Sequence, residues 1–342
     1  MYILKINALF FLVIILFSVS TLAVPPNWPK DGVIVEPDMN RAPLIAVFQE
    51  AKHSLKLSAY RLTDKRLIAE LCEAVKRGVE VELLVTRDVF KSGEKTPNDE
   101  TPMKLLKELG INVHQSPKFY DQAHHKMILV DDLYALIGTP NMGKNSFDDN
   151  KESKAQRGFW VTVTDKNQLK ELKNVFTADF NGEKTNLKNS LLVWSPDQGR
   201  APFIKLIHSA KNSLWIYQPD IEDEEIACAL AEAARKGIDV RLIMPPFPYS
   251  KTKDANIPNQ EMIRDAGGKV GLITHVVGHA KVILVDVGTK LAKAWVGSVN
   301  FYPPSLDRNR ELGIITSHLP TINKISSVFE VDWGQANFTA RK

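Results

Sequence analysis

The alternation of apolar and polar positions along this chain predicts a regular series of helices and strands. An amphipathic pattern begins at Pro43, where proline suits the first turn of a helix, and the apolar stretch "SLKLSAY" that follows is typical of a strand. A helical pattern rich in Ala, Glu and Leu then runs to Gly78, a residue type that often ends helices, and leads into the β-branched run "VEVELLV". Strands and helices that alternate in this way predict a mostly parallel sheet with helices on both faces.

The same series occurs a second time in the chain. The stretch "RAPLIAVFQEAKHSLKLSAY" from Arg41 matches "RAPFIKLIHSAKNSLWIYQP" from Arg200 without gaps. Each copy continues through a helix, a strand and a long polar loop to further strands, and closes with a related helix, "VFTADF" or "VFEVDW". An internal repeat of this length indicates two structural units. We predict that residues 31–182 and 183–342 form tandem α/β repeats, each a mostly parallel mixed sheet flanked by helices.

The N-terminal segment has the order of features found in a secretory signal. Lys5 precedes an uninterrupted apolar run from Ala8 to Phe17, and small residues around Ala23 come before a proline-rich stretch. We predict that residues 1–23 are a signal peptide and that the protein is periplasmic or secreted. The alternative is a single-pass membrane anchor, for which the apolar run is at the short limit.

Composition narrows the classes of protein and partner only slightly. The chain of 342 residues is 44% hydrophobic, enough for a substantial core, and its 44 basic and 40 acidic residues give a net charge of +4. No basic arm or stripe indicates non-specific nucleic-acid binding, so charge leaves anionic lipid, nucleic acid and small phosphodiesters open as partners. The only cysteines, Cys72 and Cys228, lie in alanine-rich helical patterns, where we expect buried free thiols.

A polar motif recurs in the later part of each repeat. It reads "HHKMILVDDLYALIGTPN" from His124 and "HAKVILVDVGTKLAKAWVGSVN" from His279. On a strand, the histidine and the lysine two residues later project to the same face, and the apolar residues after them are typical of a buried central strand. Both copies keep these types while their surroundings diverge, which indicates a shared function. The members are His124, Lys126, Asp131, Thr139, Asn141 and Glu152 in the first copy, and His279, Lys281, Asp286, Ser298, Asn300 and Glu311 in the second.

These residues resemble the signature of the phospholipase D superfamily, His-x-Lys-x4-Asp followed by Gly-Ser-x-Asn. The resemblance extends from about residue 31 to residue 335. It implies that the two repeats pack with pseudo-twofold symmetry and form one active site between them, so that the protein is active as a monomer. It also implies a phosphodiesterase that needs no metal or cofactor and works through a phosphohistidine intermediate.

The chemistry of such a reaction explains why two motifs are needed. Cleavage of a phosphodiester without a metal requires a nucleophile, an acid for the departing alkoxide and fixed donors for the phosphoryl oxygens. Two histidines can supply the first two functions. The resemblance implies that His124 is the nucleophile and that His279 is the general acid and later the base. We expect the other motif residues to bind the phosphate (Lys126, Lys281, Asn141, Asn300, Thr139 and Ser298), to orient a histidine (Glu311) or to stabilise the sheet (Asp131 and Asp286).

The two copies differ where a carboxylate would support a histidine. Glu311 stands in clear register with the second motif, that of His279. In the first copy, counting forward from the asparagine of the motif assigns this position to Glu152. Aligning the glycine of "RGFW" with that of "LGII" assigns it to Gln156 instead. The sequence leaves this choice open.

The substrate is predicted from weaker signals. Aromatic residues in the polar loops and an export signal suit an enzyme that meets membranes, so we predict hydrolysis of a phospholipid headgroup to give phosphatidate, with a membrane surface as partner. One alternative is an exported nuclease of the same superfamily, with nucleic acid as partner. Another is a phosphatidyl transferase of the cardiolipin synthase type, less favoured because such synthases typically carry two N-terminal spans and this chain has one short apolar run. The headgroup, and water or an alcohol as acceptor, stay open.

Overall fold

The computed structural model describes residues 32–91, 94–147, 155–246 and 254–339, so the predicted signal peptide lies outside the described residues. The helices and strands of the first half are β1 (Val33–Glu36), α1 (Ala42–Glu50), β2 (Ser54–Ala59), α2 (Lys65–Lys76), β3 (Glu80–Val85), β4 (Asp88–Lys91), β5 (Glu94–Pro97), α3 (Met103–Glu108), β6 (Asn112–Gln115), β7 (Met127–Val130), β8 (Tyr134–Gly138), a 3-10 helix (Lys144–Ser146), β9 (Gln156–Val163) and α4 (Lys166–Asn181). Those of the second half are β10 (Val193–Ser195), α5 (Ala201–His208), β11 (Ser213–Tyr217), α6 (Glu224–Arg235), β12 (Asp239–Met244), α7 (Ile257–Asp265), β13 (Lys269–Leu272), β14 (Val277–Gly278), β15 (Val282–Val285), β16 (Lys293–Gly297), α8 (Pro303–Asp307), β17 (Glu311–Thr316) and α9 (Leu319–Gly334).

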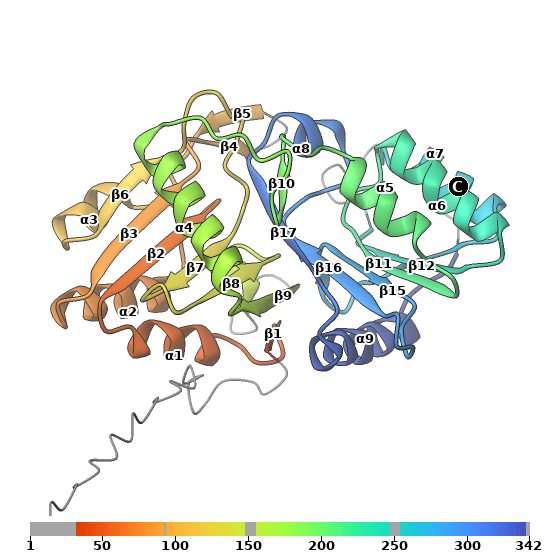
Figure 1. Ribbon diagram of the computed structural model, residues 1–342, viewed down its shortest axis with the longest axis horizontal. Coiled ribbons are helices and arrows are strands. Elements are labelled where there is room, and N and C mark those ends of the chain that lie inside the picture. Colours follow the sequence, from red (N-terminus) through yellow and green to blue (C-terminus); the bar gives the residue numbers. More distant parts are fainter. Residues whose placement is uncertain (1–31, 92–93, 148–154, 247–253, 340–342) are drawn as a thin grey trace, which may run out of the picture.

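Each half is built on one mixed sheet, and the two sheets have equivalent strand orders (Figure 1). The first runs β1-β9-β8-β7-β2-β3-β6 and the second β10-β17-β16-β15-β11-β12-β13. The predicted α/β fold with two similar halves is therefore confirmed. The sheets are less parallel than the pattern predicts, since along each of these strand orders two pairings are parallel and four are antiparallel. Strands β7 and β8 are joined by a short turn without a helical crossover, and strands connected in this way pair antiparallel.

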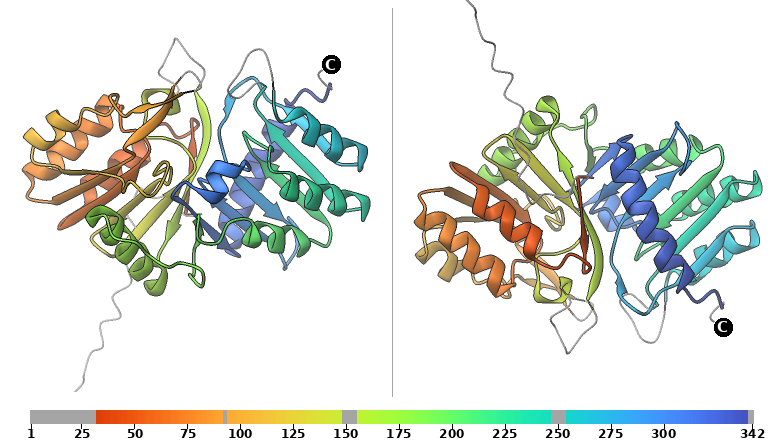
Figure 2. Two further views of the ribbon diagram at one scale, coloured as in Figure 1. Left: turned by 90° about the horizontal axis from the view of Figure 1, so that it is seen from above. Right: turned by 90° about the horizontal axis from the view of Figure 1, so that it is seen from below.

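Helices cover both faces of each sheet, as predicted. Helices α1, α2 and α3 cover one face of the first sheet, and α5, α6 and α7 cover the equivalent face of the second (Figure 1). Helices α4 and α9 lie on the other faces (Figure 2). They pack into a cluster of buried side chains to which both halves contribute, such as Phe176 and Phe329. Burial of this shared apolar surface holds the halves together. Among the described helices, none is both long and apolar enough to span a membrane.

Backbone pairing also joins the two halves. Strand β14 of the second half pairs with the start of β9 in the first, with Gly278 opposite Arg157. The reciprocal contact is a bridge between Ala123 and Arg310. Because Gly278 and Ala123 immediately precede the motif histidines, each histidine is placed against a strand of the other half.

The aspartates of the two motifs contact the sheet, as the sequence predicts. Asp131 accepts hydrogen bonds from the backbone N–H groups of residues 52–54, before and at the start of β2, at 2.7–2.9 Å. Asp286 accepts them from residues 211–213, at the equivalent place before β11, at 2.7–3.2 Å. Both aspartates have a φ of 51°, a left-handed conformation that Asp tolerates better than most residues. They tie the turn after the histidine strand to the neighbouring central strand.

The glycine of each Gly-Ser/Thr-x-Asn turn is required by close packing. A Cβ on Gly138 would lie 2.4 Å from the Trp160 ring, and one on Gly297 would lie 2.5 Å from the backbone oxygen of Leu312. No side chain can be accommodated at such distances, so only glycine lets β8 and β16 approach their neighbours here.

The two cysteines lie on equivalent helices. Cys72 is half-buried on α2, Cys228 is exposed on α6, and both are free thiols. The expectation of a buried thiol is therefore wrong for Cys228. In the alanine-rich stretch, Ala227 and Leu230 face the core and Cys228 faces the solvent.

Glu36 is a buried carboxyl group at the end of β1. Its side chain is fully buried, Oε1 accepts a hydrogen bond from Trp160 Nε1 at 2.8 Å, and Oε2 has no hydrogen-bond partner within the described part of the chain. Burial raises the pKa of Glu36 to about 8, against the smaller lowering by the Trp160 hydrogen bond. The folded protein therefore holds this group mostly protonated at neutral pH.

Replacing Glu36 with glutamine should change how stability depends on pH. Because the pKa of Glu36 is raised from 4.5 to about 8 on folding, the wild type loses stability as the pH rises through this window. Glu36→Gln has no group that titrates here and so does not lose stability in this way. We expect its free energy of unfolding to exceed that of the wild type by roughly 3–5 kcal/mol at the upper end of this pH window. Urea unfolding across the window measures this difference. Glu80→Gln, at an exposed position on β3, is the control. A difference in the free energy of unfolding between E36Q and the wild type that does not change with pH would contradict a raised pKa for Glu36.

Candidate active site

The histidine and lysine of each motif lie immediately before a central strand. Strands β7 and β15 begin at Met127 and Val282, so the two pairs precede the strands in which the sequence placed them. Lys126 and Lys281 are fully buried, and each Nζ donates a hydrogen bond to the carbonyl oxygen of the motif histidine two residues earlier. These bonds hold the two ammonium groups in fixed positions.

The structure brings the two motifs together at the junction of the halves. The backbone N–H of His124 donates to the carbonyl oxygen of Arg310, in the other half, at 2.9 Å. Burial is the main cause of the lowered pKa values of His124 and His279, and the charge of the lysine in the opposite motif lowers each further. The side chains are thus close enough for each motif to act on the other, and the two motifs form one site.

Glu311 is the centre of a hydrogen-bond network that holds His124. Its fully buried carboxylate accepts hydrogen bonds from His124 Nδ1 at 2.9 and 3.1 Å, and from Ser298 Oγ and Ser305 Oγ at 2.5 Å each. The sequence associates Glu311 with the motif of His279. In the structure it contacts the histidine of the other motif instead, because the two halves exchange contacts across the junction.

This contact determines which nitrogen of His124 is available for chemistry. Burial raises the pKa of Glu311, but the charges and hydrogen bonds around it, first of all those of His124, bring it below its usual value. An ionised carboxylate only accepts hydrogen bonds, so His124 Nδ1 must carry a proton, and Nε2 of the neutral ring presents a lone pair. Burial, more than any charge, lowers the pKa of His124 to about 4. A neutral imidazole with a free Nε2 is the form that acts as a nucleophile near neutral pH.

His279 has a different environment. It is half-buried, and the Nζ of Lys281 lies 3.3 Å from its Nδ1 and 3.4 Å from its Nε2. Burial and then the charges of Lys281 and Lys126 lower the pKa of His279 well below its usual value. In the ranges that the structure describes, no carboxylate contacts its ring. The two motif histidines are therefore not equivalent.

Strand register shows what the first half has in place of Glu311. Ser195 lies opposite Glu311 in the pair β10–β17, and Glu36 lies opposite Gly158 in the equivalent pair β1–β9. The backbone bridges between the halves give the same equivalence. Gly158 thus takes the place of Glu311, and a Cβ there would lie only 2.6 Å from the Pro140 side chain. The first half has closed the space that a carboxylate would need.

Neither sequence alternative for this carboxylate stands at the equivalent position. Gln156 lies two residues before Gly158, so its assignment was wrong, because the register follows the strand pairing and not the nearby glycines. Glu152 lies outside the described residues.

The hydroxyl groups expected to bind phosphate are engaged within the fold. Ser298 Oγ donates to Glu311 and accepts the backbone N–H of Leu312 at 3.1 Å. Thr139 Oγ1 accepts the equivalent N–H of Phe159 at 3.0 Å. Both residues are fully buried, so the structure places them as supports of the turn and, for Ser298, of the carboxylate.

Two lysines and two asparagines of the motifs lie at the centre of the site. The Oδ1 atoms of Asn141 and Asn300 are buried and have no hydrogen-bond partner among the described residues. Burial lowers the pKa of Lys281 to about 7, and burial followed by the charge of Lys281 lowers that of Lys126. Two buried lysine amines and the side-chain N–H groups of two asparagines suit an anion such as a phosphodiester, whose negative charge favours the protonated form of each amine. The described residues contain no cluster of His, Cys, Asp or Glu that could hold a metal ion.

Sequence reasoning missed Tyr60 and the two arginines of the junction. The ring of Tyr60 contacts that of His124 edge to face, with centroids 4.9 Å apart. Arg157 immediately precedes Gly158, and Arg310 immediately precedes Glu311, the residue at the equivalent position in the second half. The sequence does contain a signal for the arginines. The closing helices, "VFTADF" and "VFEVDW", are separated by fewer residues than the two histidine motifs are. Aligning the halves on these helices places Arg157 opposite Arg310.

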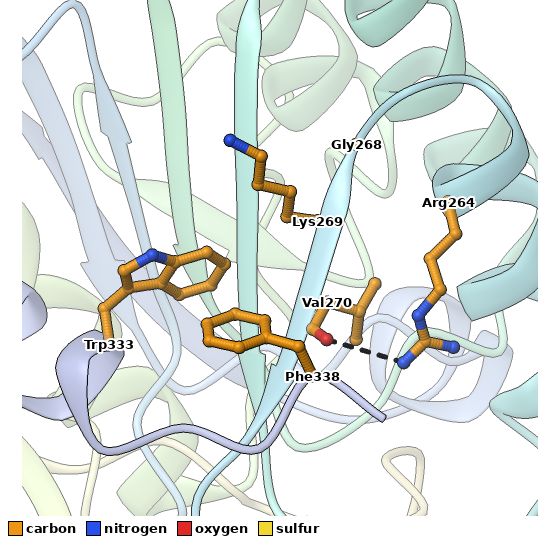
Figure 3. A pocket seen from close by; sticks show the side chains of 6 residues that line it. All are labelled: Arg264, Gly268, Lys269, Val270, Trp333 and Phe338. Atoms are coloured by element: carbon orange, nitrogen blue, oxygen red, sulfur yellow. Dashed lines mark hydrogen bonds between the residues drawn. The ribbon is translucent and has the colours of Figure 1, made fainter. Parts of the chain in front are cut away.

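A separate pocket lies away from this site. It has a volume of about 450 Å³ and is found where α7, β13 and the segment after α9 meet, at the outer end of the second half (Figure 3). Its lining contains none of the motif residues: Arg264, Gly268, Lys269, Val270, Trp333 and Phe338.

Both halves match one family of domains. The family model described as "Cardiolipin synthase, PLD-like domain" matches residues 44–180 and 203–333. The chain is 27% identical over 241 residues to a cardiolipin synthase of Halalkalibacterium halodurans, covering 63% of this chain and 46% of that protein. It is 27% identical over 346 residues to a cardiolipin synthase of Geobacillus kaustophilus, covering 90% of this chain and 67% of that protein. The chain thus spans about half to two thirds of the length of these relatives.

A solved structure shares the fold over both halves. The phosphatidylserine synthase of Haemophilus influenzae matches with a TM-score of 0.66 at 12% identity, covering 92% of this chain and 88% of that one. At this identity the likeness concerns the fold alone.

Proposed function

This chain belongs to the phospholipase D superfamily, with a cardiolipin synthase-like domain in each half, and we propose that it is a phosphatidyl transferase of the cardiolipin synthase type. As a member of this superfamily it is a phosphodiesterase. The observation that carries the proposal is the contact of His124 with Glu311 across the halves, which leaves one nucleophilic nitrogen beside a second histidine and two buried lysines. The reaction moves a phosphatidyl group from a donor lipid to an alcohol.

In the first step, the lone pair of His124 Nε2 attacks the phosphorus atom of the donor. The bond from phosphorus to the headgroup oxygen breaks, and that oxygen takes a proton from the imidazolium of His279. Burial and then the lysine charges lower the pKa of His279, and the negative charge of the bound phosphate acts in the opposite direction and favours the protonated ring. Lys126, Lys281 and the motif asparagines hold the phosphoryl oxygens, and Glu311 stabilises the charge that the His124 ring gains.

In the second step, the acceptor hydroxyl gives its proton to the neutral ring of His279. Its oxygen attacks phosphorus, and the phosphorus–nitrogen bond to His124 breaks. An alcohol as acceptor gives transfer, and water gives hydrolysis to phosphatidate. The sequence analysis predicts hydrolysis with phosphatidyl transfer as an alternative, and the names of both relatives, cardiolipin synthases, support the alternative.

The test offers the purified protein three substrates in parallel with EDTA present. These are vesicles of phosphatidylglycerol, vesicles of phosphatidylcholine and single-stranded DNA. We expect phosphatidylglycerol to be converted to cardiolipin with release of glycerol. Phosphatidate as the sole lipid product would replace transfer by hydrolysis, and cleaved DNA without lipid turnover would assign the site to a nuclease.

A further inference from the structure

Tyr60 contacts the ring of His124 at a position where the second half has no equivalent aromatic side chain. The two ring centroids are 4.9 Å apart and the planes make an angle of 75°. The Nζ of Lys126 lies 5.7 Å from the centre of the same tyrosine ring. The gapless match between the halves puts Pro219 at the equivalent position. The contact is therefore a property of the first motif and not of the repeat.

Tyr60 is itself held in place by hydrogen bonds. Its phenolic oxygen accepts the backbone N–H of Phe90 at 2.7 Å and the side-chain N–H of Gln122 at 3.2 Å. Phe90 lies in the two-stranded β4–β5 hairpin, and Gln122 lies two residues before His124. With an exposed fraction of 7%, the tyrosine is fixed between the hairpin and the motif.

We propose that Tyr60 is a positioning residue for His124, which together with Glu311 fixes the imidazole so that Nε2 meets the phosphorus. A hydrogen bond at Nδ1 still allows the ring to swing about that contact, whereas an aromatic edge against the ring restricts this movement. A nucleophile must approach phosphorus along a defined line, while an acid or base only has to reach a proton. The histidine with both supports is thus suited to attack, and His279 to proton transfer. This inference rests on the proposed function.

Two substitutions of Tyr60 separate the ring from the phenolic oxygen. Tyr60→Leu removes both, and we expect it to slow formation of the phosphohistidine intermediate on a p-nitrophenyl phosphodiester by about 10–100-fold, since small misplacements of a reacting atom cost this much. Tyr60→Phe keeps the ring and should form the intermediate nearly as fast as the wild type. Breakdown of the intermediate depends on His279 and should be unchanged in both variants. Pro219→Ala, at the equivalent position, is the control and should leave both steps unchanged.

A second measurement does not depend on turnover. In nitrogen-resolved NMR spectra of the free protein, His124 of the wild type and of Y60F should show one tautomer with the proton on Nδ1, and Y60L should show a broadened signal. A wild-type rate of formation in Y60L, or equal slowing of formation and breakdown, would overturn the role of Tyr60. If the wild type forms no intermediate, the proposed function fails, and the NMR comparison alone decides whether Tyr60 orients His124.

Discussion

Replacing His124 with alanine should abolish turnover, with a rate at least about 10⁴-fold below that of the wild type. His124 is the histidine whose Nδ1 is bonded to a buried carboxylate and whose Nε2 is left with a lone pair. Alanine removes the atom that bonds to phosphorus, and the rest of the site then only binds the substrate. Release of p-nitrophenol from an activated phosphodiester measures the loss, and residual turnover well above background would contradict the mechanism.

His279→Ala is the matched variant that separates the roles of the two histidines. A p-nitrophenolate ion leaves without needing a proton, so H279A should still form the phosphohistidine intermediate on this donor and then release it slowly. H124A should form none. Mass spectrometry of the protein at alkaline pH, where phosphohistidine survives, detects the modified residue. An intermediate on His279 in the H124A variant would exchange the two roles.

Repetition made the central residues of this site predictable from sequence. A histidine next to a lysine is a weak signal, but two copies that keep the same residue types in the same order point to a shared function. The motif aspartates could be assigned to the sheet because their spacing turns them away from the histidine face, and Asp131 and Asp286 each bind a row of backbone N–H groups. The helix and strand order followed from local periodicity in the same way.

The partners of these residues could not be predicted, because they depend on contacts between segments that are distant in sequence or lie in different halves. Glu311 lies in register with one motif and bonds to the histidine of the other, and no local pattern encodes a contact across the junction. Tyr60 lies in the same half as His124, but it reaches His124 only because β2 pairs with β7, the strand of the motif, which is distant in sequence. Ser298 looked like a phosphate ligand in sequence, and only the structure shows its hydroxyl committed to Glu311.

The ion pair of Arg310 with Asp179 should be among the costliest contacts in the protein to break. Arg310 Nε and Nη2 each donate to the Asp179 carboxylate at 2.8 Å, and the two side chains are 0% and 1% exposed. Arg157 and Asp332 form the equivalent pair at 2.8 and 2.9 Å. Each pair joins the start of β9 or β17 in one half to the closing helix of the other half, α9 or α4, so the two pairs act at the junction that forms the site.

Asp179→Leu should lower the free energy of unfolding by about 3–5 kcal/mol, because it leaves the Arg310 guanidinium buried without its main counter-ion. Asp197, 3.3 Å from Arg310 Nη1, compensates in part and favours the lower end of this range. Urea unfolding measures the effect. Glu73→Gln breaks an exposed ion pair with Lys76 and should leave the unfolding midpoint unchanged.

The double variant Asp179→Leu/Arg310→Met distinguishes an unpaired charge from a lost attraction. If the cost of Asp179→Leu comes from the stranded guanidinium, removing that charge as well should restore much of the stability, since two apolar side chains can replace a buried ion pair at little cost. The carbonyl oxygen of Arg310 accepts the backbone N–H of His124, and Glu311 is the next residue along the chain. The single variant Asp179→Leu should therefore also lose activity under conditions in which it is still folded. A double variant that is less stable than the single one would show that the pair itself stabilises the junction, and would contradict this account.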